Sequence, residues 1–275
     1  MGNKPAAKFK VGVTDASLKL AANPEALLWA SELLFDGLQV SIGRKLVDGK
    51  LPLSSPGLQK QYLAEAKKQS CPLASLCLDI LADVGLKSRG DGQAARFVAD
   101  SILIAKALGV KVVMLPCLGK QAMQSPAEID AVADLLKELG PAAAKAHVVL
   151  GLATTLSARD NARLLDRTRS HAVQVYYDVG DAAKSQFDVV EELRWLGKSR
   201  ICELHFKDNP GYLGKGAIDF HPIVDALADI GFPGFVQLET DAPGGDLEMD
   251  MIQNLNFVRG LIRERNEAGG KKPPL

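Results

Sequence analysis

The sequence predicts a single (β/α)8 barrel. Short apolar runs alternate with longer segments of helical periodicity, and this alternation repeats eight times along the chain. Strands joined by connections of helix length pair in parallel, and eight such units need about 250 residues. The chain has 275 residues and no linker-like stretch, which favours one domain over residues 1–275. An open doubly wound sheet is the alternative architecture.

The predicted strands are short and rich in valine, leucine and isoleucine, as strands buried on both faces should be. In chain order they are residues 10–14 (KVGVT), 38–42 (LQVSI), 73–79 (LASLCLD), 110–116 (VKVVMLP), 147–153 (HVVLGLA), 173–178 (VQVYYD), 201–207 (ICELHFK) and 235–239 (FVQLE).

Helical periodicity fills the segments between these strands. Asn23 before Pro24 and Ser125 before Pro126 are typical helix N-caps followed by proline in the first turn. Glycines stand where four of the helices are expected to end. The predicted helices are 24–36, a run ending at 105–109, 126–140, 157–169, 188–198, 219–231 and 246–266, and the glycines are Gly109, Gly140, Gly197 and Gly231.

The last of these helices closes the ring. The ordered barrel with its closing helix is therefore expected to span about residues 10–266, and residues 267–275 are expected to be a frayed tail.

Composition narrows the class of function. Lys plus Arg and Asp plus Glu both number 33, so no global field attracts nucleic acid or an anionic membrane. No apolar run of membrane-spanning length occurs, and no secretory signal is visible at the start. The four cysteines are far apart without a CxxC pair, which indicates reduced thiols and a cytoplasmic protein. A small-molecule partner is the expectation.

Three polar side chains come at the ends of three successive predicted strands. Asp178 ends the sixth, His205 lies near the end of the seventh and Glu239 ends the eighth. Active sites of such barrels lie at the carboxyl ends of the strands. An Asp, a neutral His and a Glu suit a divalent ion, with manganese the first choice and magnesium, cobalt or zinc as alternatives.

From about residue 95 to 240 the chain resembles the xylose isomerase-like barrel superfamily, in particular its sugar isomerases and epimerases, which include ketose 3-epimerases, hydroxypyruvate isomerase and inosose dehydratase. The strings that carry the resemblance are ADSILIAKALGVKVVMLP (99–116), GLATTLSARDNARLLD (151–166), VYYDVGD (175–181), LHFKD with GYLGKGAIDF (204–220) and GFVQLET (234–240).

The resemblance implies that Asp178, His205 and Glu239 are metal ligands and that Glu239 also exchanges protons with carbon. It further implies a glutamate at the end of the fifth strand, where this chain has Ala153. A methyl group neither binds metal nor carries a proton. The alanine is either a natural divergence toward one-base chemistry or an engineered replacement of a glutamate, since GLETTLS would fit the family.

Four further residues are predicted to contact substrate. Lys207 shares a strand face with His205 by alternation and could polarise a substrate oxygen. Asp181 stands where sugar 3-epimerases often have a histidine, which argues against a free ketohexose. Gln39 lies on the second predicted strand, and Gly214 belongs to a glycine-rich loop, GYLGKG, that could cradle a phosphate.

The function implied is metal-dependent isomerisation or epimerisation of an α-hydroxy carbonyl sugar through an enediolate. Two alternatives stay open on the same barrel. One is a lyase or dehydratase that eliminates from a 3-keto-glycoside or a keto-inositol, and the other is a catalytically dead sugar-binding protein. A nuclease is disfavoured because the chain has only four histidines and no excess of basic residues. Homo-oligomerisation is possible, as in many relatives.

Overall fold

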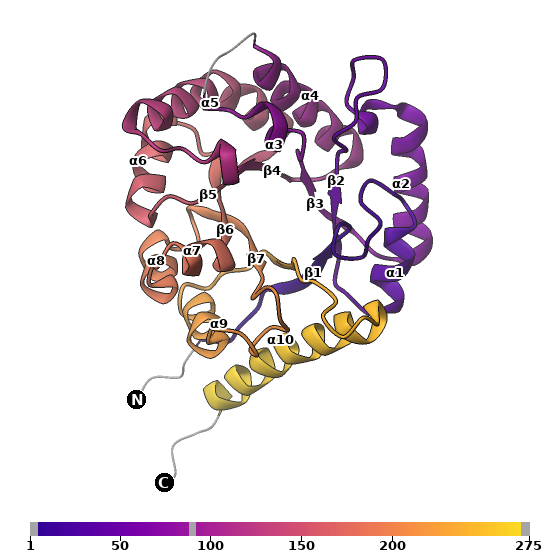
Figure 1. The fold of residues 1–275 in the computed structure, drawn as a ribbon, viewed down its shortest axis with the longest axis vertical. Coiled ribbons are helices and arrows are strands. Elements are labelled where there is room, and N and C mark those ends of the chain that lie inside the picture. Colours follow the sequence, from indigo (N-terminus) through magenta and orange to yellow (C-terminus); the bar gives the residue numbers. More distant parts are fainter. Residues whose placement is uncertain (1–4, 88–91, 271–275) are drawn as a thin grey trace.

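Eight parallel strands form a closed barrel in the computed structural model, which describes residues 5–87 and 92–270 (Figure 1). Each strand pairs with the next, and the first pairs with the last, which excludes the open sheet. The strands are β1 (Lys10–Thr14), β2 (Leu38–Ser41), β3 (Leu73–Cys77), β4 (Val112–Cys117), β5 (Val149–Thr154), β6 (Val173–Asp178), β7 (Ile201–Phe206) and β8 (Phe235–Leu238). The predicted (β/α)8 barrel is therefore confirmed.

Helices surround the barrel on its outside (Figure 1). They are α1 (Ala26–Glu32), α2 (Pro56–Gln69), α3 (Leu81–Val84), α4 (Gln93–Leu108), α5 (Pro126–Ala146), α6 (Ala158–Thr168), α7 (Val179–Lys184), α8 (Val189–Leu196), α9 (Phe220–Asp229) and α10 (Leu247–Gly270), with short 3-10 turns η1 (Pro52–Ser54) and η2 (Gly119–Gln121). In the described part of the chain, no helix is both long and apolar enough to cross a membrane.

Two helices extend beyond their predicted ends. Helix α5 continues past Gly140 and through Pro141 to Ala146. Gly140 is required for packing, because a Cβ there would lie 2.6 Å from the Ser170 hydroxyl. Helix α10 runs to Gly270, so residues 267–270 belong to the helix rather than to a frayed tail. The rest of that predicted tail lies outside the described residues.

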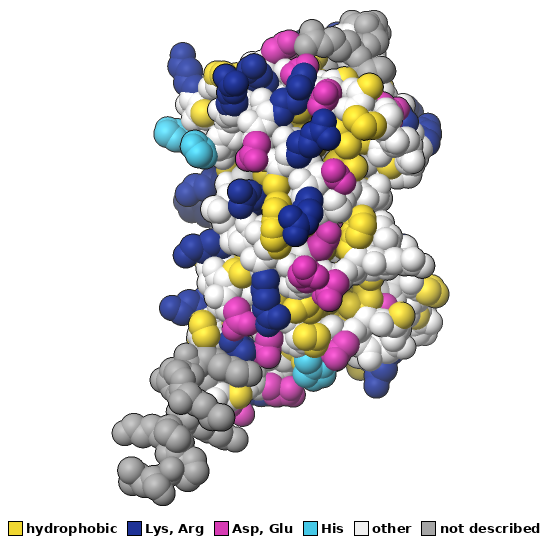
Figure 2. All heavy atoms as spheres, turned by 90° about the vertical axis from the view of Figure 1, so that its left-hand side faces the viewer, with side chains coloured by type: hydrophobic (Ala, Val, Ile, Leu, Met, Phe, Trp, Pro, Cys, Tyr) yellow, Lys and Arg dark blue, Asp and Glu magenta, His cyan; other side chains and the backbone are white. Residues whose placement is uncertain are grey.

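The surface carries both signs of charge in close alternation. On the face shown in Figure 2, basic and acidic side chains are interspersed. Arg167, for example, forms ion pairs with Asp134 at 2.8 Å and with Asp130 at 3.6 Å. This alternation agrees with the balanced composition and provides no single-sign patch on that face.

The barrel interior is unusually polar for this fold, in which branched aliphatic side chains normally fill the centre. Gln39, Ser75, Glu203 and Gln237 are all at most 3% exposed. Gly12 makes room for this layer, because a Cβ there would lie 2.1 Å from the Gln237 side-chain oxygen. The polar layer lies below the carboxyl ends of the strands and supports the site described next.

Candidate metal centre

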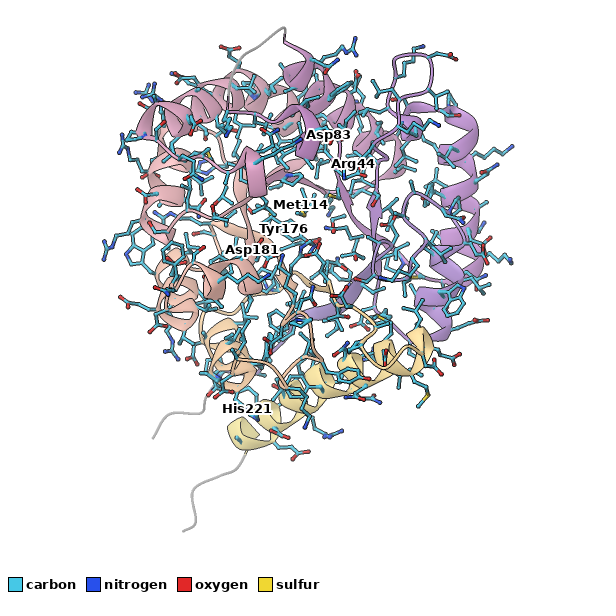
Figure 3. All side chains as sticks on the ribbon, in the orientation of Figure 1. Arg44, Asp83, Met114, Tyr176, Asp181 and His221 are labelled. Atoms are coloured by element: carbon cyan, nitrogen blue, oxygen red, sulfur yellow. The ribbon has the colours of Figure 1, made fainter. Side chains whose placement is uncertain are left out.

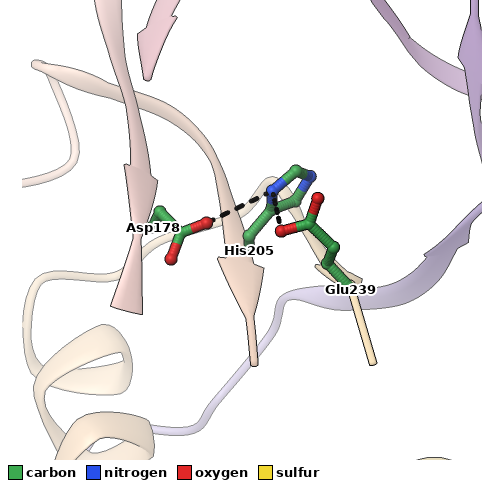
Figure 4. A group of neighbouring side chains, drawn as sticks. All are labelled: Asp178, His205 and Glu239. Atoms are coloured by element: carbon green, nitrogen blue, oxygen red, sulfur yellow. Dashed lines mark ion pairs between the residues drawn. The ribbon is translucent and has the colours of Figure 1, made fainter. Parts of the chain in front are cut away.

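Strand register brings Asp178, His205 and Glu239 to one point (Figure 4). Asp178 is the last residue of β6 and pairs with His205 of β7, while Glu239 directly follows β8. One ligand atom from each residue lies within 4.8 Å of the other two. In the described ranges, 5–87 and 92–270, no other group of three His, Cys, Asp or Glu side chains has this geometry.

Two of the donor atoms, Asp178 Oδ2 and His205 Nδ1, are completely buried, and His205 Nδ1 has no hydrogen-bond partner. They lie 3.5 Å apart, and Glu239 Oε2 is 3.4 Å from the same nitrogen. Asp178 Oδ1 accepts a hydrogen bond from the Asp181 amide at 2.8 Å, so this carboxylate caps α7 with one oxygen and directs the other into the cluster, where the Lys207 ammonium lies 2.8 Å away. A buried polar atom without a partner is costly, and a divalent cation would satisfy His205 Nδ1 and bind the adjacent carboxylate oxygens. The residues present therefore fit a metal ion.

The ionisation of the three groups is mutually dependent. Burial lowers the pKa of His205, but the adjacent Glu239 and Asp178 carboxylates outweigh burial and raise it. Burial raises the pKa of Glu239, yet His205 and Lys207 together hold it below its usual range. Glu239 is therefore ionised at neutral pH, as a metal ligand or general base must be.

Lys207 extends its ammonium group into the same cluster. Its Nζ lies 2.8 Å from Asp178 Oδ2 and 3.1 Å from both Asp181 Oδ2 and Glu239 Oε2. Burial lowers the pKa of Lys207, but the Asp178 and Glu239 carboxylates more than compensate and raise it. The prediction that Lys207 shares the face of His205 is confirmed by this placement.

Two of the sequence strings that carry the family resemblance contact each other at Lys207. Gly180, from VYYDVGD, packs against the Lys207 stem, from LHFKD. A Cβ at position 180 would lie 2.4 Å from Lys207 Cγ and 3.0 Å from the Lys207 carbonyl oxygen. The glycine thus permits the approach of Lys207 to the cluster.

We expect Gly180→Ala to displace Lys207 and to destabilise the fold by about 1–3 kcal/mol, as overpacking does. Urea denaturation would measure the change. Gly57→Ala is the matched control, because Gly57 lies in the first turn of α2 with only the Ser55 hydroxyl, 3.7 Å away, near its missing Cβ. Equal stability of the two variants would show that the glycine at 180 is dispensable.

Ala153 is fully buried near the end of β5. It packs in a small cluster with Met114 and Tyr176, both labelled near the centre of the ring in Figure 3. No donor atom is available from this side chain, so the described ligand set has three residues rather than four.

Asp181 and Gln39 both contact the cluster, from opposite sides. Asp181 accepts a hydrogen bond from Lys207 at 3.1 Å, and burial followed by the charge of Asp178 raises its pKa. Gln39 lies in the interior layer, with its side-chain oxygen 2.9 Å from His205 Nε2.

Gly214 belongs to a loop in which several backbone amides already donate hydrogen bonds within the protein. The amides of Leu213, Lys215 and Gly216 donate to Asn254, to the Tyr212 carbonyl and to Asp208, respectively. Phe257 fills the space at Gly214 that a Cβ would need. A phosphate contact at Gly214 therefore stays a prediction without support from this geometry.

A cavity of about 340 Å³ opens beside Glu239 and Lys207, and Asn209 is among its other lining residues. The Asn209 side-chain oxygen is buried and has no hydrogen-bond partner. The sequence reasoning missed this residue and also Glu203, which alternation places on the His205 face of β7, one layer deeper.

Comparison with known proteins decides the family. Residues 27–261 match the model of the xylose isomerase-like TIM barrel family. The chain belongs to this family. No curated protein matches the chain.

Solved structures share the fold at low sequence identity. An L-ribulose 3-epimerase is 18% identical with a TM-score of 0.79, and the match covers 96% of this chain and 100% of that one. The apo form of the E. coli 3-keto-D-glucoside 4-epimerase YcjR is 18% identical (TM-score 0.72; coverage 92% and 100%). IolI, solved with a bound zinc atom, is 17% identical (TM-score 0.73; coverage 94% and 99%).

Proposed function

We propose that this chain is a divalent-metal-dependent enzyme that isomerises or epimerises a sugar with an α-hydroxy carbonyl group. The observation that carries the proposal is the convergence of Asp178 Oδ2, His205 Nδ1 and Glu239 Oε2, of which the buried His205 Nδ1 has no hydrogen-bond partner. Membership of the family and its likeness to sugar epimerases support the substrate class. The metal is manganese by preference, with magnesium, cobalt or zinc as alternatives.

Asp178, His205 and Glu239 would hold the ion, which when bound supplies a Lewis acid for the carbonyl and hydroxyl oxygens of the substrate. Glu239 is ionised and borders the open cavity, so it removes the proton from the carbon next to the carbonyl. The electron pair of that C–H bond moves toward the carbonyl oxygen and gives an enediolate.

Lys207 donates a hydrogen bond to the substrate oxygen on which negative charge develops. The Asn209 side chain lines the same cavity and would contact a substrate hydroxyl there. Asp181 holds the Lys207 ammonium from the opposite side. These assignments are part of the proposal.

The number of proton-transferring groups favours isomerisation over epimerisation. Glu239 alone can return its proton to the neighbouring carbon on the same face, while the hydroxyl proton of the enediolate passes to the former carbonyl oxygen, and the sugar is isomerised. Epimerisation by opposite-face return needs a second acid, and at position 153 the side chain is a methyl group packed against Met114 and Tyr176. Elimination from a 3-keto-glycoside or keto-inositol also needs only one base and is therefore the second candidate.

The decisive assay for this proposal is hydrogen exchange at carbon. Manganese-loaded protein is incubated in D2O with ketoses, 3-keto-glycosides and inososes, and proton NMR follows the signal next to the carbonyl. Deuterium incorporation together with a new isomer supports isomerisation, and an unsaturated product supports elimination. Binding of a sugar without any exchange would instead identify a catalytically dead sugar-binding barrel.

We expect Lys207→Met to separate metal binding from catalysis. The ammonium competes with the cation for the Asp178 and Glu239 carboxylates, so its removal should tighten manganese binding at least about tenfold. Loss of the hydrogen bond to the substrate oxygen should lower kcat by about 100-fold.

Calorimetric titration and steady-state kinetics measure these two effects. Lys198→Met, on the exposed surface after α8, controls for the loss of a lysine. Weaker manganese binding in Lys207→Met would contradict this competition and would show that Lys207 stabilises the metal-bound site.

The proposal also places the protein in the cytoplasm, because all four cysteines are free thiols. Homo-oligomerisation remains a prediction that size-exclusion chromatography with light scattering would test.

A further inference from the structure

Directly beneath the candidate ligands lies a continuous buried hydrogen-bond network. Its members are the side chains of Gln39, Ser75, Tyr176, Glu203 and Gln237, contributed by five different strands and at most 3% exposed. Burial of polar groups is unfavourable unless they are hydrogen-bonded. The Gln237 side-chain oxygen has no partner, but the bonds that join Gln39, Ser75, Tyr176 and Glu203 each have a defined direction. The direction of these bonds has a consequence for the metal centre.

Glu203 is the acceptor at one end of the network. Its Oε2 accepts from the Ser75 hydroxyl at 2.7 Å and from the Tyr176 hydroxyl at 3.2 Å. Gln237 Nε2 donates to the same oxygen at 3.2 Å. Each hydroxyl has only one proton to donate. Once that proton is directed at Glu203, the hydroxyl oxygens of Ser75 and Tyr176 can only accept from their remaining neighbour.

That neighbour is the side-chain amide of Gln39. Its Nε2 donates to the Tyr176 hydroxyl at 2.8 Å and to the Ser75 hydroxyl at 3.1 Å. An amide turned by 180° would direct its oxygen at two hydroxyl oxygens that have no proton left for it. The orientation of Gln39 is therefore determined by the Glu203 carboxylate, through two hydroxyl groups in parallel.

The other end of the Gln39 amide faces the metal centre. Its Oε1 lies 2.9 Å from His205 Nε2 and, as a carbonyl oxygen, can only accept. His205 Nε2 must therefore carry a hydrogen atom. The remaining ring nitrogen, Nδ1, is the atom that faces Asp178 Oδ2 and Glu239 Oε2.

We propose that Gln39 is a positioning residue that keeps a proton on His205 Nε2 and so reserves Nδ1 for the metal ion. Glu203 fixes the orientation of the Gln39 amide, because it accepts the hydroxyl protons of Ser75 and Tyr176. The proposal rests on the proposed metal site but concerns a different layer of the barrel. It explains why a charged and an amide side chain occupy an interior that aliphatic side chains normally fill.

The test compares three variants of the full chain. Gln39→Met keeps a similar length but removes the acceptor, whereas Gln39→Glu keeps an acceptor oxygen facing His205. Gln237→Met is the matched control, because Gln237 is an equally buried amide that donates to Glu203. It has no hydrogen bond to His205 among the contacts of the described residues. Circular dichroism establishes that each variant is folded.

Two readouts are measured: manganese affinity by calorimetry, and the protonation of each His205 nitrogen by 15N NMR of the zinc-loaded protein. We expect Gln39→Met to weaken manganese binding by about 10–100-fold and to lose the slowly exchanging Nε2 proton. Gln39→Glu should retain that proton, and Gln237→Met should change neither readout by more than about threefold.

The other outcomes would overturn either the positioning role of Gln39 or the proposed function. Wild-type affinity and an intact Nε2 proton in Gln39→Met would overturn the positioning role. Equal losses in Gln39→Met and Gln237→Met would assign the effect to general disruption of the interior and would overturn it as well. Absence of metal binding by the wild-type protein would instead refute the proposed function.

Discussion

Glu239→Gln is expected to lower kcat by about 10²–10⁴-fold, because it removes the carboxylate that borders the cavity within the metal-ligand cluster and is proposed to accept the carbon-bound proton. The amide keeps the size of the side chain and one oxygen near His205. It cannot accept a proton from carbon, and it weakens the attraction for a cation. Steady-state kinetics at saturating manganese separates the catalytic loss from weaker metal binding.

Glu248→Gln serves as the control for Glu239→Gln, because Glu248 is an exposed carboxylate in the first turn of α10. Its kinetics should equal those of the wild-type chain. Wild-type turnover in Glu239→Gln would show that Glu239 is not the general base and would refute the proposed mechanism.

Ala153→Glu is expected to complete a four-residue ligand set and to tighten manganese binding at least about tenfold. If position 153 is that of the missing glutamate, the same substitution supplies a second proton-transferring group on the opposite side of the substrate. We therefore expect epimerised product to appear in the NMR assay alongside any isomer. Without metal, the new charge, buried beside Met114 and Tyr176, should cost about 3–5 kcal/mol of stability.

Thermal unfolding with and without manganese measures both the loss of metal-free stability and the gain in metal binding. The metal-free Tm of Ala153→Glu should fall below that of the wild type, and the rise in Tm on adding manganese should be larger. Ala153→Gln adds the same bulk next to Met114 and Tyr176 without a charge, and it should show no gain in affinity. If neither metal affinity nor turnover rises in Ala153→Glu, position 153 is not the site of a missing ligand.

Much of the barrel could be predicted because its signals are local. The strand at 10–14 and the one at 173–178 have the predicted bounds, since each is an apolar run with a clear end. The third strand ends at Cys77 rather than at residue 79, because Asp79 leaves the sheet and accepts the Gly43 amide. Such endings depend on tertiary contacts that a local pattern does not contain.

The first helix shows the same limit. Periodicity predicts a helix over 24–36, but α1 ends at Glu32. Leu34 adopts a positive φ of 66°, and the Phe35 amide returns to the Ala30 carbonyl, which buries the Phe35 ring. Packing of one aromatic side chain against the core thus determines where the helix stops.

The candidate site was predictable where it depends on strand ends. Asp178, His205 and Glu239 converge because parallel strands in register bring their carboxyl ends to one edge. Asn209 was not predictable, because its place in the cavity depends on the path of a loop. The role of Gln39 depends on hydrogen-bond directions across four strands, which no sequence pattern reveals.

Calorimetric titration of the EDTA-treated protein with manganese shows whether Asp178, His205 and Glu239 hold a metal ion. We expect one ion per chain, and no binding in Asp178→Asn, which removes the charge of a buried carboxylate in the cluster. We also expect deuterium exchange next to the substrate carbonyl to stop with EDTA and to return with manganese. Absence of manganese binding by the wild-type chain, or unchanged binding in Asp178→Asn, would refute the metal site.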